Sequence, residues 1–278
     1  GRLDSTNIIS PELDVITNIS KDHCAQLGDT LREIAHEKAG IMRESIACIC
    51  GEPSEEIRGY LAEEARAHRT PLRFAQEEIP QVSFRHIGNE LIIGHTPFGT
   101  LNYQLTAEYQ HENALTVMAA ILQLRRQGWS IPDNAVKSGF AGVCTLTGLA
   151  GRWMKLADSP LTIADTGHNI GGWLHLAPLI AALPKPLTVV LGFADDKDTS
   201  DILCLLPADA DYIATQADIP RARNAEKLAC QLSEAGLKAR PVAGVKRAFD
   251  EARAQTPAEG AVFVGGSTYV IADLLKLL

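Results

Sequence analysis

The chain has 278 residues, 46% of them hydrophobic, and its 26 Lys and Arg against 34 Asp and Glu give a formal net charge of -8. This composition excludes an intrinsically disordered chain, and the length favours two domains. The acidic balance leaves no basic stripe for a nucleic-acid backbone. No signal peptide is found, nor any apolar run of the roughly 18 residues that a membrane span needs. We therefore expect a cytoplasmic globular protein that binds neither nucleic acid nor membranes.

In the first part of the chain, buried strands are expected to alternate with helices. Apolar runs predict strands at residues 13–19 and 46–50. Thr30 and Glu33 have the spacing of a capping box, which predicts a helix that begins there and ends at Ile41. A charged amphipathic stretch at residues 54–68 predicts a second helix.

The next segment changes its periodicity. Residues 81–106 alternate apolar and polar side chains around a Gly88-Asn89 turn, which predicts an antiparallel hairpin. Helices are expected at residues 110–126 and 132–141. Gly and Thr are frequent at residues 144–150, so this stretch is the expected linker between two domains.

The second half alternates short β-rich runs with helical stretches. Strands are expected at residues 161–165, 187–192, 211–215, 239–243 and 261–264. Helices are expected at residues 171–183, 200–206, 224–235, 245–255 and 268–277. This alternation is typical of a doubly wound, mostly parallel α/β sheet, in which ligands bind at the carboxyl ends of the strands.

The six cysteines are scattered, which indicates cytosolic thiols more than a disulfide framework. Cys48 and Cys50 are two residues apart, so both are expected on one face of a buried strand. Their spacing is not that of a C-x-x-C pair, and we expect no structural zinc site.

Motifs for phosphate binding are weak in this chain. The G-x-x-x-x-G-K-[ST] loop is absent, and the nearest string, at residues 192–197, lacks the second glycine and carries two aspartates that would repel phosphate. The Gly265-Gly266-Ser267 turn follows a strand and opens a helix, so it either binds an anion through its amides or is a plain tight turn.

Polar residues beside the strand ends leave alternatives open. Asp22-His23 follows a buried strand and suits either a cation ligand or a turn. Lys38 is either a solvated surface charge or a desolvated amine with a lowered pKa. Residues 165–169 join a strand to a helix, where Asp, His and Asn suit both capping and ligand contact.

Taken in order, a series of short strings is more specific than any of them alone. The strings are GRLDSTN at 1–7, ITNISKDHCAQLG at 16–28, IAHEKAGI at 34–41, YQHENA at 109–114, GRW at 151–153, DTGHN at 165–169, DKD at 196–198 and GGSTY at 265–269. Together they resemble the folylpolyglutamate synthase/dihydrofolate synthase family of the Mur-ligase superfamily, over the whole length of the chain.

The resemblance implies an α/β fold in two parts. Residues 1–150 would be the C-terminal portion of a Mur-ligase-type central ATPase domain. Residues 151–278 would be a doubly wound, mostly parallel Rossmann-like C-terminal domain. In the family the P-loop lies upstream of GRLDSTN, so we expect this chain to be a fragment that lacks it and is inactive by itself.

The resemblance also implies the reaction. The family's ATP-dependent ligases phosphorylate a substrate carboxylate, and the amino group of glutamate then attacks the acyl phosphate to form an amide. The expected ligands are ATP, Mg²⁺, L-glutamate and either dihydropteroate or a reduced folate, and the expected oligomeric state is a monomer. Two alternatives stay open: another Mur-type ligase, acting on a peptidoglycan precursor, or a non-catalytic nucleotide-binding relative without a P-loop.

The resemblance assigns roles to residues that match the family's motifs. Lys38, as a carbamate, and His168, near the phosphates or the incoming glutamate, would be catalytic. Contacts outside the chemical step would come from Asn113 (adenine), Arg152 (phosphate), Asp165 (ribose), Asp4 (the pterin end of the folate) and His23 (magnesium). This chain has Thr166-Gly167 where the family usually has Gly-Ala; both are small, so the geometry is expected to survive.

Overall fold

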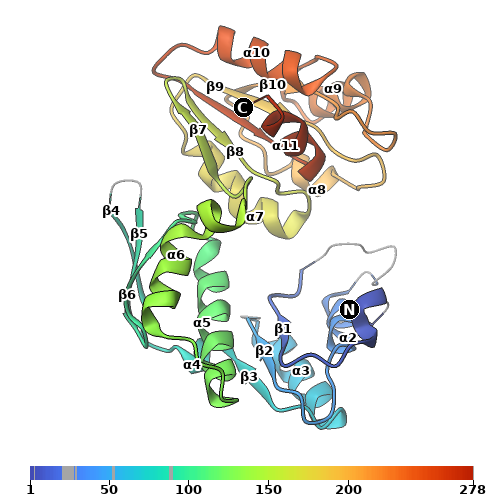
Figure 1. Ribbon diagram of the computed structural model, residues 1–278. Helices are drawn as coiled ribbons and strands as arrows, with labels where there is room; N and C mark the ends of the chain where they lie inside the picture. Colours follow the sequence, from blue (N-terminus) through green and yellow to red (C-terminus); the bar gives the residue numbers. More distant parts are fainter. Residues whose placement is uncertain (3, 21–27, 29, 52–53, 88–89, 278) are drawn as a thin grey trace. The chain divides into compact units, whose positions relative to one another are not determined.

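The structure is a computed structural model that describes residues 1–278 except 3, 21–27, 29, 52–53, 88–89 and 278. It divides into two compact units, an N-terminal unit, Gly1–Gly148, and a C-terminal unit, Leu149–Leu278 (Figure 1). The sequence prediction put the boundary after residue 150. Of the described helices, none combines the length and apolar character that crossing a membrane requires.

A small parallel sheet with two helices forms one part of the N-terminal unit. Its strands, in the order β1-β2-β3, are β1 (Asp14–Ile16), β2 (Cys48–Cys50) and β3 (Leu72–Phe74). Its two α-helices are α2 (Leu31–Ala39) and α3 (Glu55–Ala67), and the short 3₁₀ helix η1 (Ser5–Ile8) lies near the N-terminus. The predicted capping box is present, since Thr30 and Glu33 each accept a hydrogen bond from the other's backbone N–H.

The two cysteines of β2 share one face of this sheet, as predicted. Cys48 and Cys50 are fully buried and pack with Ile34 of α2 and Leu61 of α3, while Ile49 packs on the opposite side with a different cluster. The pair therefore fills the core beneath the two helices. Burial raises the pKa of the Cys48 thiol, which keeps it protonated and unreactive.

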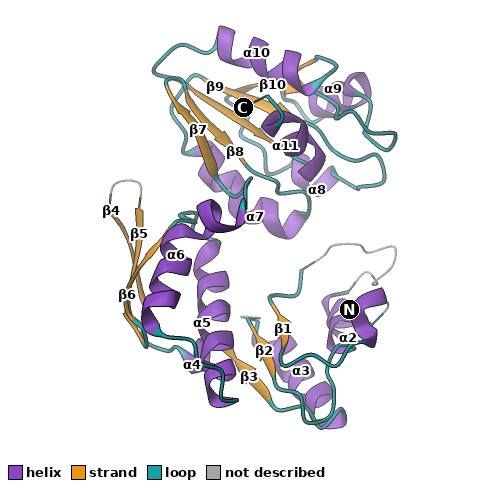
Figure 2. Ribbon diagram, in the orientation of Figure 1, coloured by secondary structure: helices purple, strands orange, loops and turns teal. Residues whose placement is uncertain are grey.

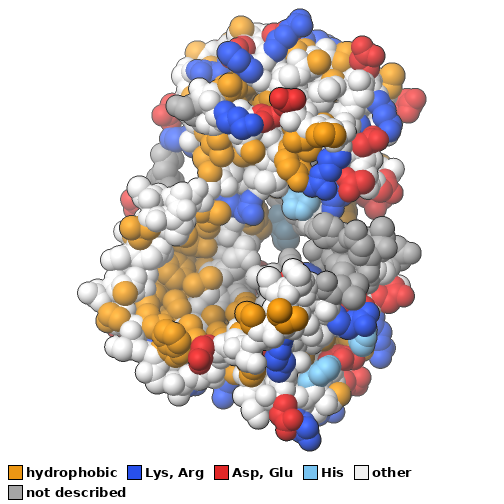
Figure 3. Space-filling model, turned by 45° about the vertical axis from the view of Figure 1, so that its right-hand side comes forward, with side chains coloured by type: hydrophobic (Ala, Val, Ile, Leu, Met, Phe, Trp, Pro, Cys, Tyr) orange, Lys and Arg blue, Asp and Glu red, His pale blue; other side chains and the backbone are white. Residues whose placement is uncertain are grey.

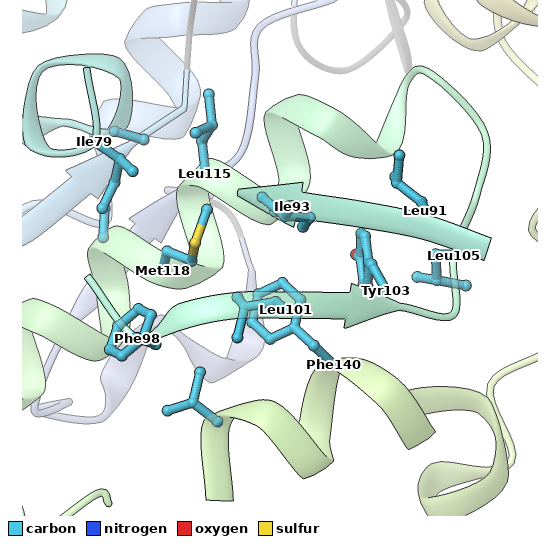
Figure 4. Close-up of a cluster of buried hydrophobic side chains, with 14 of the residues drawn as sticks. Ile79, Leu91, Ile93, Phe98, Leu101, Tyr103, Leu105, Leu115, Met118 and Phe140 are labelled. Carbon is cyan, nitrogen blue, oxygen red and sulfur yellow. The ribbon is translucent and has the colours of Figure 1, made fainter. Parts of the chain in front are cut away.

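An antiparallel sheet and the helices α4 (Ala75–Glu78), α5 (Gln110–Arg126) and α6 (Asp133–Thr147) form the other part of the N-terminal unit. The strands of the sheet are β4 (Ser83–Ile87), β5 (Glu90–Thr96) and β6 (Gly99–Tyr103). Figure 4 shows the core that they share, in which Leu91 and Ile93 of β5 meet Leu101 of β6, Met118 of α5 and Phe140 of α6. The predicted hairpin is confirmed, although its turn lies outside the described residues, and β6 adds a third strand.

The expected linker at residues 144–150 is wrong for most of its length. Helix α6 continues to Thr147 and ends at Gly148, which adopts the left-handed conformation with φ 71°. Gly142 interrupts the helical backbone, and the Cys144 N–H donates instead to the Gln104 side chain at 2.8 Å. That side-chain partner allows a Gly- and Thr-rich stretch to remain helical.

The C-terminal unit is a six-stranded sheet with helices on both faces (Figure 2). Its strands are β7 (Met154–Asp158), β8 (Leu161–Ala164), β9 (Leu187–Leu191), β10 (Ala210–Ala214), β11 (Lys238–Pro241) and β12 (Ala261–Gly265). Its helices are α7 (Ile170–Ala181), α8 (Ser200–Leu203), α9 (Ala225–Glu234), α10 (Val245–Gln255) and α11 (Thr268–Leu275). The order is β11-β10-β9-β12-β8-β7, parallel except for β7, which the sequence did not predict. The predicted α/β class is confirmed.

Alternation along β12 shows which helices cover which face. Val262 and Val264 pack in one cluster with Val270 of α11. Phe263, between them, faces the other way and meets the edge of the Trp173 ring of α7, with ring centroids 6.2 Å apart. The adjacent strands β8 and β12 are thus followed by helices on opposite faces. A crevice outside the carboxyl ends of such a pair is where doubly wound sheets bind ligands.

The GRLDSTN segment is fastened to the end of α2. Arg2 forms a bidentate pair with Glu37, with nitrogen–oxygen distances of 2.7 and 3.1 Å, and its backbone N–H donates to the Glu37 carbonyl. Asn7 donates to the Gly40 carbonyl at 3.0 Å and accepts from Arg43 at 2.6 Å. Two motifs that lie far apart in the sequence therefore form one structural piece.

Charges of both signs are mixed on the surface. Lys246 pairs with Asp250 and Arg247 with Glu251 along one exposed side of α10, each four residues apart. Figure 3 shows acidic and basic side chains interspersed on the visible surface. On this side of α10 the charges are therefore paired locally.

Thiol reactivity tests the placement of the cysteines. Cys204 and Cys230 are exposed, whereas Cys48 and Cys50 are buried. We predict that iodoacetamide at pH 8 modifies Cys204 and Cys230 rapidly and reaches the β2 pair only after urea unfolding, as measured by peptide mass mapping. Modification of Cys48 at the rate of Cys204 in the folded protein would contradict the packing of β2.

The Arg2–Glu37 pair predicts a pH-dependent attachment of the N-terminal segment. The hydrogen bond from Arg2 lowers the pKa of Glu37 below its ordinary value. The pair's contribution is therefore present above the unfolded-state pKa of about 4.3 and is lost as the pH falls through the lower folded-state pKa. Hydrogen exchange of residues 1–9 should thus accelerate at low pH in the wild type, after correction for intrinsic rates. In Glu37→Gln it should already be fast at pH 7, and equal protection of the two proteins at pH 7 would refute the attachment.

Candidate functional site

In the N-terminal unit, the predicted residue Lys38 lies at the carboxyl end of β1. Its ammonium donates a hydrogen bond to the carbonyl of Asn18, which follows β1, at 2.8 Å. The side chain is partly buried and belongs to the last turn of α2, which the GRLDSTN segment holds in place. Lys38 is therefore a positioned amine at the strand edge where ligands of parallel sheets gather.

The neighbouring strand β2 ends against α5. A Cβ on Gly51 would lie 2.1 Å from the Thr116 hydroxyl and 2.5 Å from the Thr17 carbonyl, so only glycine fits there. Asn113 lies three residues before Thr116 on α5 and thus on the same side of the helix. Its amide donates to the Gln110 side chain at 2.9 Å, which fixes the amide group.

Asp4 has a local structural role in the described chain. It is the N-cap of η1, and its carboxylate accepts hydrogen bonds from the Thr6 N–H at 2.8 Å and the Thr6 hydroxyl at 2.5 Å. The hydroxyl bond is the main cause that lowers the pKa of Asp4. Asp4 is exposed to solvent. His23, the predicted magnesium ligand, lies outside the described residues.

In the C-terminal unit, Asp165 ties together the two loops beside the crevice. The residue is 3% exposed. One carboxylate oxygen accepts from the Trp153 N–H at 2.6 Å and the other from the Gly167 N–H at 2.8 Å. Buried carboxylates need such partners, because unpaired burial of a charge is costly. The structure thus gives Asp165 an organising position within the site predicted for it.

Arg152 lies on the same pair of loops. Its Nη1 donates to the hydroxyl of Thr166 and, at 3.2 Å, to the Gly151 carbonyl. The residue is exposed, and no described carboxylate forms an ion pair with it. Gly151 has φ +73°, and a Cβ there would lie 2.6 Å from the Thr166 side chain, so the loop fits only with glycine at this position.

His168 begins the turn into α7. Its Nδ1 lies 3.1 Å from the Thr166 carbonyl, which can only accept, so Nδ1 carries the proton and Nε2 is the acceptor of the neutral ring. Asn169 then caps α7 by accepting from the Gly172 N–H at 2.8 Å. Gly167 is required as a small residue, because a Cβ would lie 2.2 Å from Leu176.

The Gly265-Gly266-Ser267 turn follows β12 on the other side of the crevice. Gly266 has φ +96°, and a Cβ on it would lie 2.8 Å from the Gly192 carbonyl. The Ser267 hydroxyl caps α11 by accepting from the Tyr269 N–H at 3.1 Å. The turn is therefore a close-packed connection from strand to helix. This geometry fits a plain tight turn, which was one of the two interpretations of the sequence.

Arg223 is a residue of this region that sequence reasoning missed. It is 4% exposed and donates to the Thr199 hydroxyl at 2.6 Å and to the carbonyls of Ala194 and Lys197, so it holds the DKD loop after β9. Burial lowers its pKa, and Asp195 opposes this effect. A buried arginine has no sequence signature, because arginine is ordinarily exposed.

The predicted residues that the structure describes therefore form two groups, with Asn113 in neither. Arg152, Asp165 and His168 lie together through Gly151, Thr166 and Gly167. Lys38 and Asp4 belong to the piece built from α2 and the GRLDSTN segment. Asn113 lies on α5, on the side that contacts the end of β2. Within the described residues, no three His, Cys, Asp or Glu side chains gather closely enough to hold a metal ion.

Comparison with known proteins was made by sequence and by fold. No family model matches the chain. The dihydrofolate synthase/folylpolyglutamate synthase of Escherichia coli is 31% identical over 287 residues, which cover 100% of this chain and 63% of that protein. The chain thus spans less than two thirds of the length of this curated relative.

Solved structures give the same result. Escherichia coli FolC in complex with DHPP and ADP superposes with a TM-score of 0.81 at 29% identity, over 100% of this chain and 64% of that one. The bifunctional folylpolyglutamate synthase/dihydrofolate synthase of Yersinia pestis complexed with AMPPNP and Mn ion gives a TM-score of 0.77 at 25% identity, over 100% and 64%. Sequence and fold agree along the entire chain, which is similar over its whole length to folylpolyglutamate synthase/dihydrofolate synthases.

Proposed function

We propose that the chain is part of an ATP-dependent ligase that joins L-glutamate to the carboxylate of dihydropteroate or a reduced folate through an acyl phosphate. The observation that carries the proposal is the hydrogen-bonded group of Arg152, Asp165 and His168, which lies at the carboxyl ends of β8 and β12 in a doubly wound sheet. The E. coli relative in complex with DHPP and ADP supports the ligand classes.

In this proposal the crevice holds the nucleotide. Arg152 supplies a cation to the phosphates, since a guanidinium without a carboxylate partner suits phosphate oxygens. Asp165 positions the Arg152 loop through the Trp153 N–H, and its oxygens keep lone pairs with which to accept from a ribose hydroxyl. Asn113 is proposed as an adenine contact on the strength of the resemblance alone, and its amide is held by the Gln110 side chain.

The proposed proton acceptor is His168. When the amino group of glutamate attacks the acyl phosphate, the C–N bond forms, the C–O bond to phosphate breaks, and the nitrogen must lose a proton. Nε2 of His168 can take that proton because Nδ1 already carries one, donated to the Thr166 carbonyl.

Lys38 would act as a carbamate in the N-terminal unit. The ammonium first loses one proton. The neutral amine then reacts with carbon dioxide, which forms the N–C bond and releases a second proton, so that a cation becomes an anion. The carbamate retains one N–H, enough to keep the hydrogen bond to the Asn18 carbonyl. Asp4 is the proposed contact to the pterin end of the substrate.

A magnesium ion belongs to the proposal through the family resemblance. When bound, it would neutralise charge on the transferring phosphoryl group. The proposed ligand His23 lies outside the described residues, and the described ones offer no cluster of three donor side chains. The roles of Arg152, Asp165 and His168 do not depend on how the metal is held.

The reaction class is tested by glutamate incorporation. The assay uses the full-length protein encoded by the gene that contains this sequence. The protein is incubated with glutamate, ATP and Mg²⁺ and with either dihydropteroate or tetrahydrofolate. Products are then identified by mass spectrometry. We expect addition of glutamate that stops when ATP is omitted or EDTA is added. A UDP-muramyl peptide serves as the control acceptor. Incorporation into it alone, or into neither pterin, would overturn the folate assignment.

Removal of the proposed base should act on the chemical step. We predict that His168→Gln lowers kcat by about a hundredfold with little change in KM for ATP, in line with ordinary general-base contributions. The matched control is His175→Gln, an exposed histidine of α7, the helix that follows His168, which should leave kcat unchanged. An equal effect of both substitutions would show that His168 acts on stability rather than on proton transfer.

A further inference from the structure

We propose that Thr166 is a positioning residue for Arg152, which presents the guanidinium of this chain to the phosphates of the nucleotide. The inference rests on the proposed role of Arg152 as a phosphate contact. It concerns the position at which this sequence departs from the family's usual Gly-Ala pair, where glycine would offer no side chain at all.

The Thr166 hydroxyl can donate one hydrogen bond and accept another at the same time. A hydroxyl has one proton and two lone pairs. Thr166 Oγ1 donates its proton to the Gly151 carbonyl at 3.1 Å, and its lone pairs face the Arg152 Nη1, which donates to it. The Thr166 N–H also donates to the Gly151 carbonyl, at 2.9 Å. The acceptor offered to Arg152 therefore cannot turn away without breaking its own bond to Gly151.

The platform beneath the hydroxyl is rigid. Thr166 is 7% exposed, and its methyl group fills the space left by the missing side chain of Gly151. Its flanking residues are fixed as well, because Asp165 is bonded to Trp153 and Gly167. The buried Thr166 hydroxyl thus restricts the side-chain conformations that are open to the exposed Arg152.

The contact leaves the binding edge of the guanidinium intact. Within the described residues, Arg152 is engaged only through Nη1. Nε and Nη2 form the side edge of the fork, which can donate two parallel hydrogen bonds to a phosphate. Arginine loses much rotamer freedom when it is immobilised, so fixing it before binding reduces the entropic cost of holding the ligand.

A double-mutant cycle on nucleotide binding tests the inference. ADP and adenosine are titrated by calorimetry into the wild-type chain, Thr166→Val, Arg152→Gln and the double variant. We expect Thr166→Val to weaken ADP by about three- to tenfold, the usual effect of one hydrogen bond, and to leave adenosine unchanged. The double variant should bind ADP as Arg152→Gln does, because the hydroxyl acts through the arginine.

Two further variants separate positioning from stability. Thr166→Ser keeps the hydroxyl and should restore ADP affinity to within about twofold of the wild type. Thr162→Val removes another buried threonine hydroxyl of β8, bonded to the Pro160 carbonyl, and should not change ADP affinity. A loss shared by Thr162→Val, or losses that multiply in the double variant, would overturn the inference.

The order of the arginine gives a readout without any ligand. ¹⁵N relaxation of the Arg152 Nε–H should report a restricted side chain in the wild type and Thr166→Ser, and a freely moving one in Thr166→Val. Equal order in all three would overturn the inference even if ADP affinity changed. If the arginine loses its order but Arg152→Gln leaves ADP affinity unaltered, the proposed phosphate role of Arg152 fails and the positioning contact stands alone.

Discussion

The carboxylate of Asp165 is the group on which the C-terminal crevice depends. It is nearly fully buried, and each of its oxygens accepts one backbone N–H, from Trp153 and from Gly167. Trp153 has φ 46°, a left-handed conformation that is unfavourable for a bulky residue. Hydrogen bonds to a charged acceptor contribute roughly 1.5–3 kcal/mol, enough to hold such a residue in place. The loop that carries Arg152 therefore takes its shape from the strand that ends at Asp165.

The same logic extends around the edge of the sheet. Three glycines leave room for neighbouring backbone: a Cβ on Gly266 would meet the Gly192 carbonyl, one on Gly265 the Asp165 carbonyl, and one on Gly192 the Thr215 carbonyl. Helices α7 and α11 then leave on opposite faces of the sheet. In the N-terminal unit, α2 is held at its end by Arg2 and Asn7, so Lys38 too is presented from a fixed element. Each unit thus places polar groups by constraining the backbone that carries them.

The sequence predicts an element where burial imposes a pattern of apolar residues. It does not predict an element whose position or end depends on contacts with other elements. The strands β8, β9, β10 and β12 are short segments rich in apolar and β-branched residues, and the end of β8 led to Asp165 and His168. Strand β7 was missed because it lies at the sheet edge and has no fully buried residue. The end of α6 was missed because Gly142 breaks the periodicity and Gln104 compensates from another element. Neither the buried Arg223 nor the link from Thr166 to Arg152 can be read from residue types, since both depend on loops brought together by folding.

The most direct test of the central claim is the location of nucleotide binding in the C-terminal unit. Backbone amide chemical shifts of the ¹⁵N-labelled chain are recorded with and without ADP. The account predicts the largest changes at residues 151–153, 165–168 and 265–267, which line the carboxyl ends of β8 and β12. Shifts confined to the opposite edge of the sheet, at the amino ends of those strands, would contradict the account.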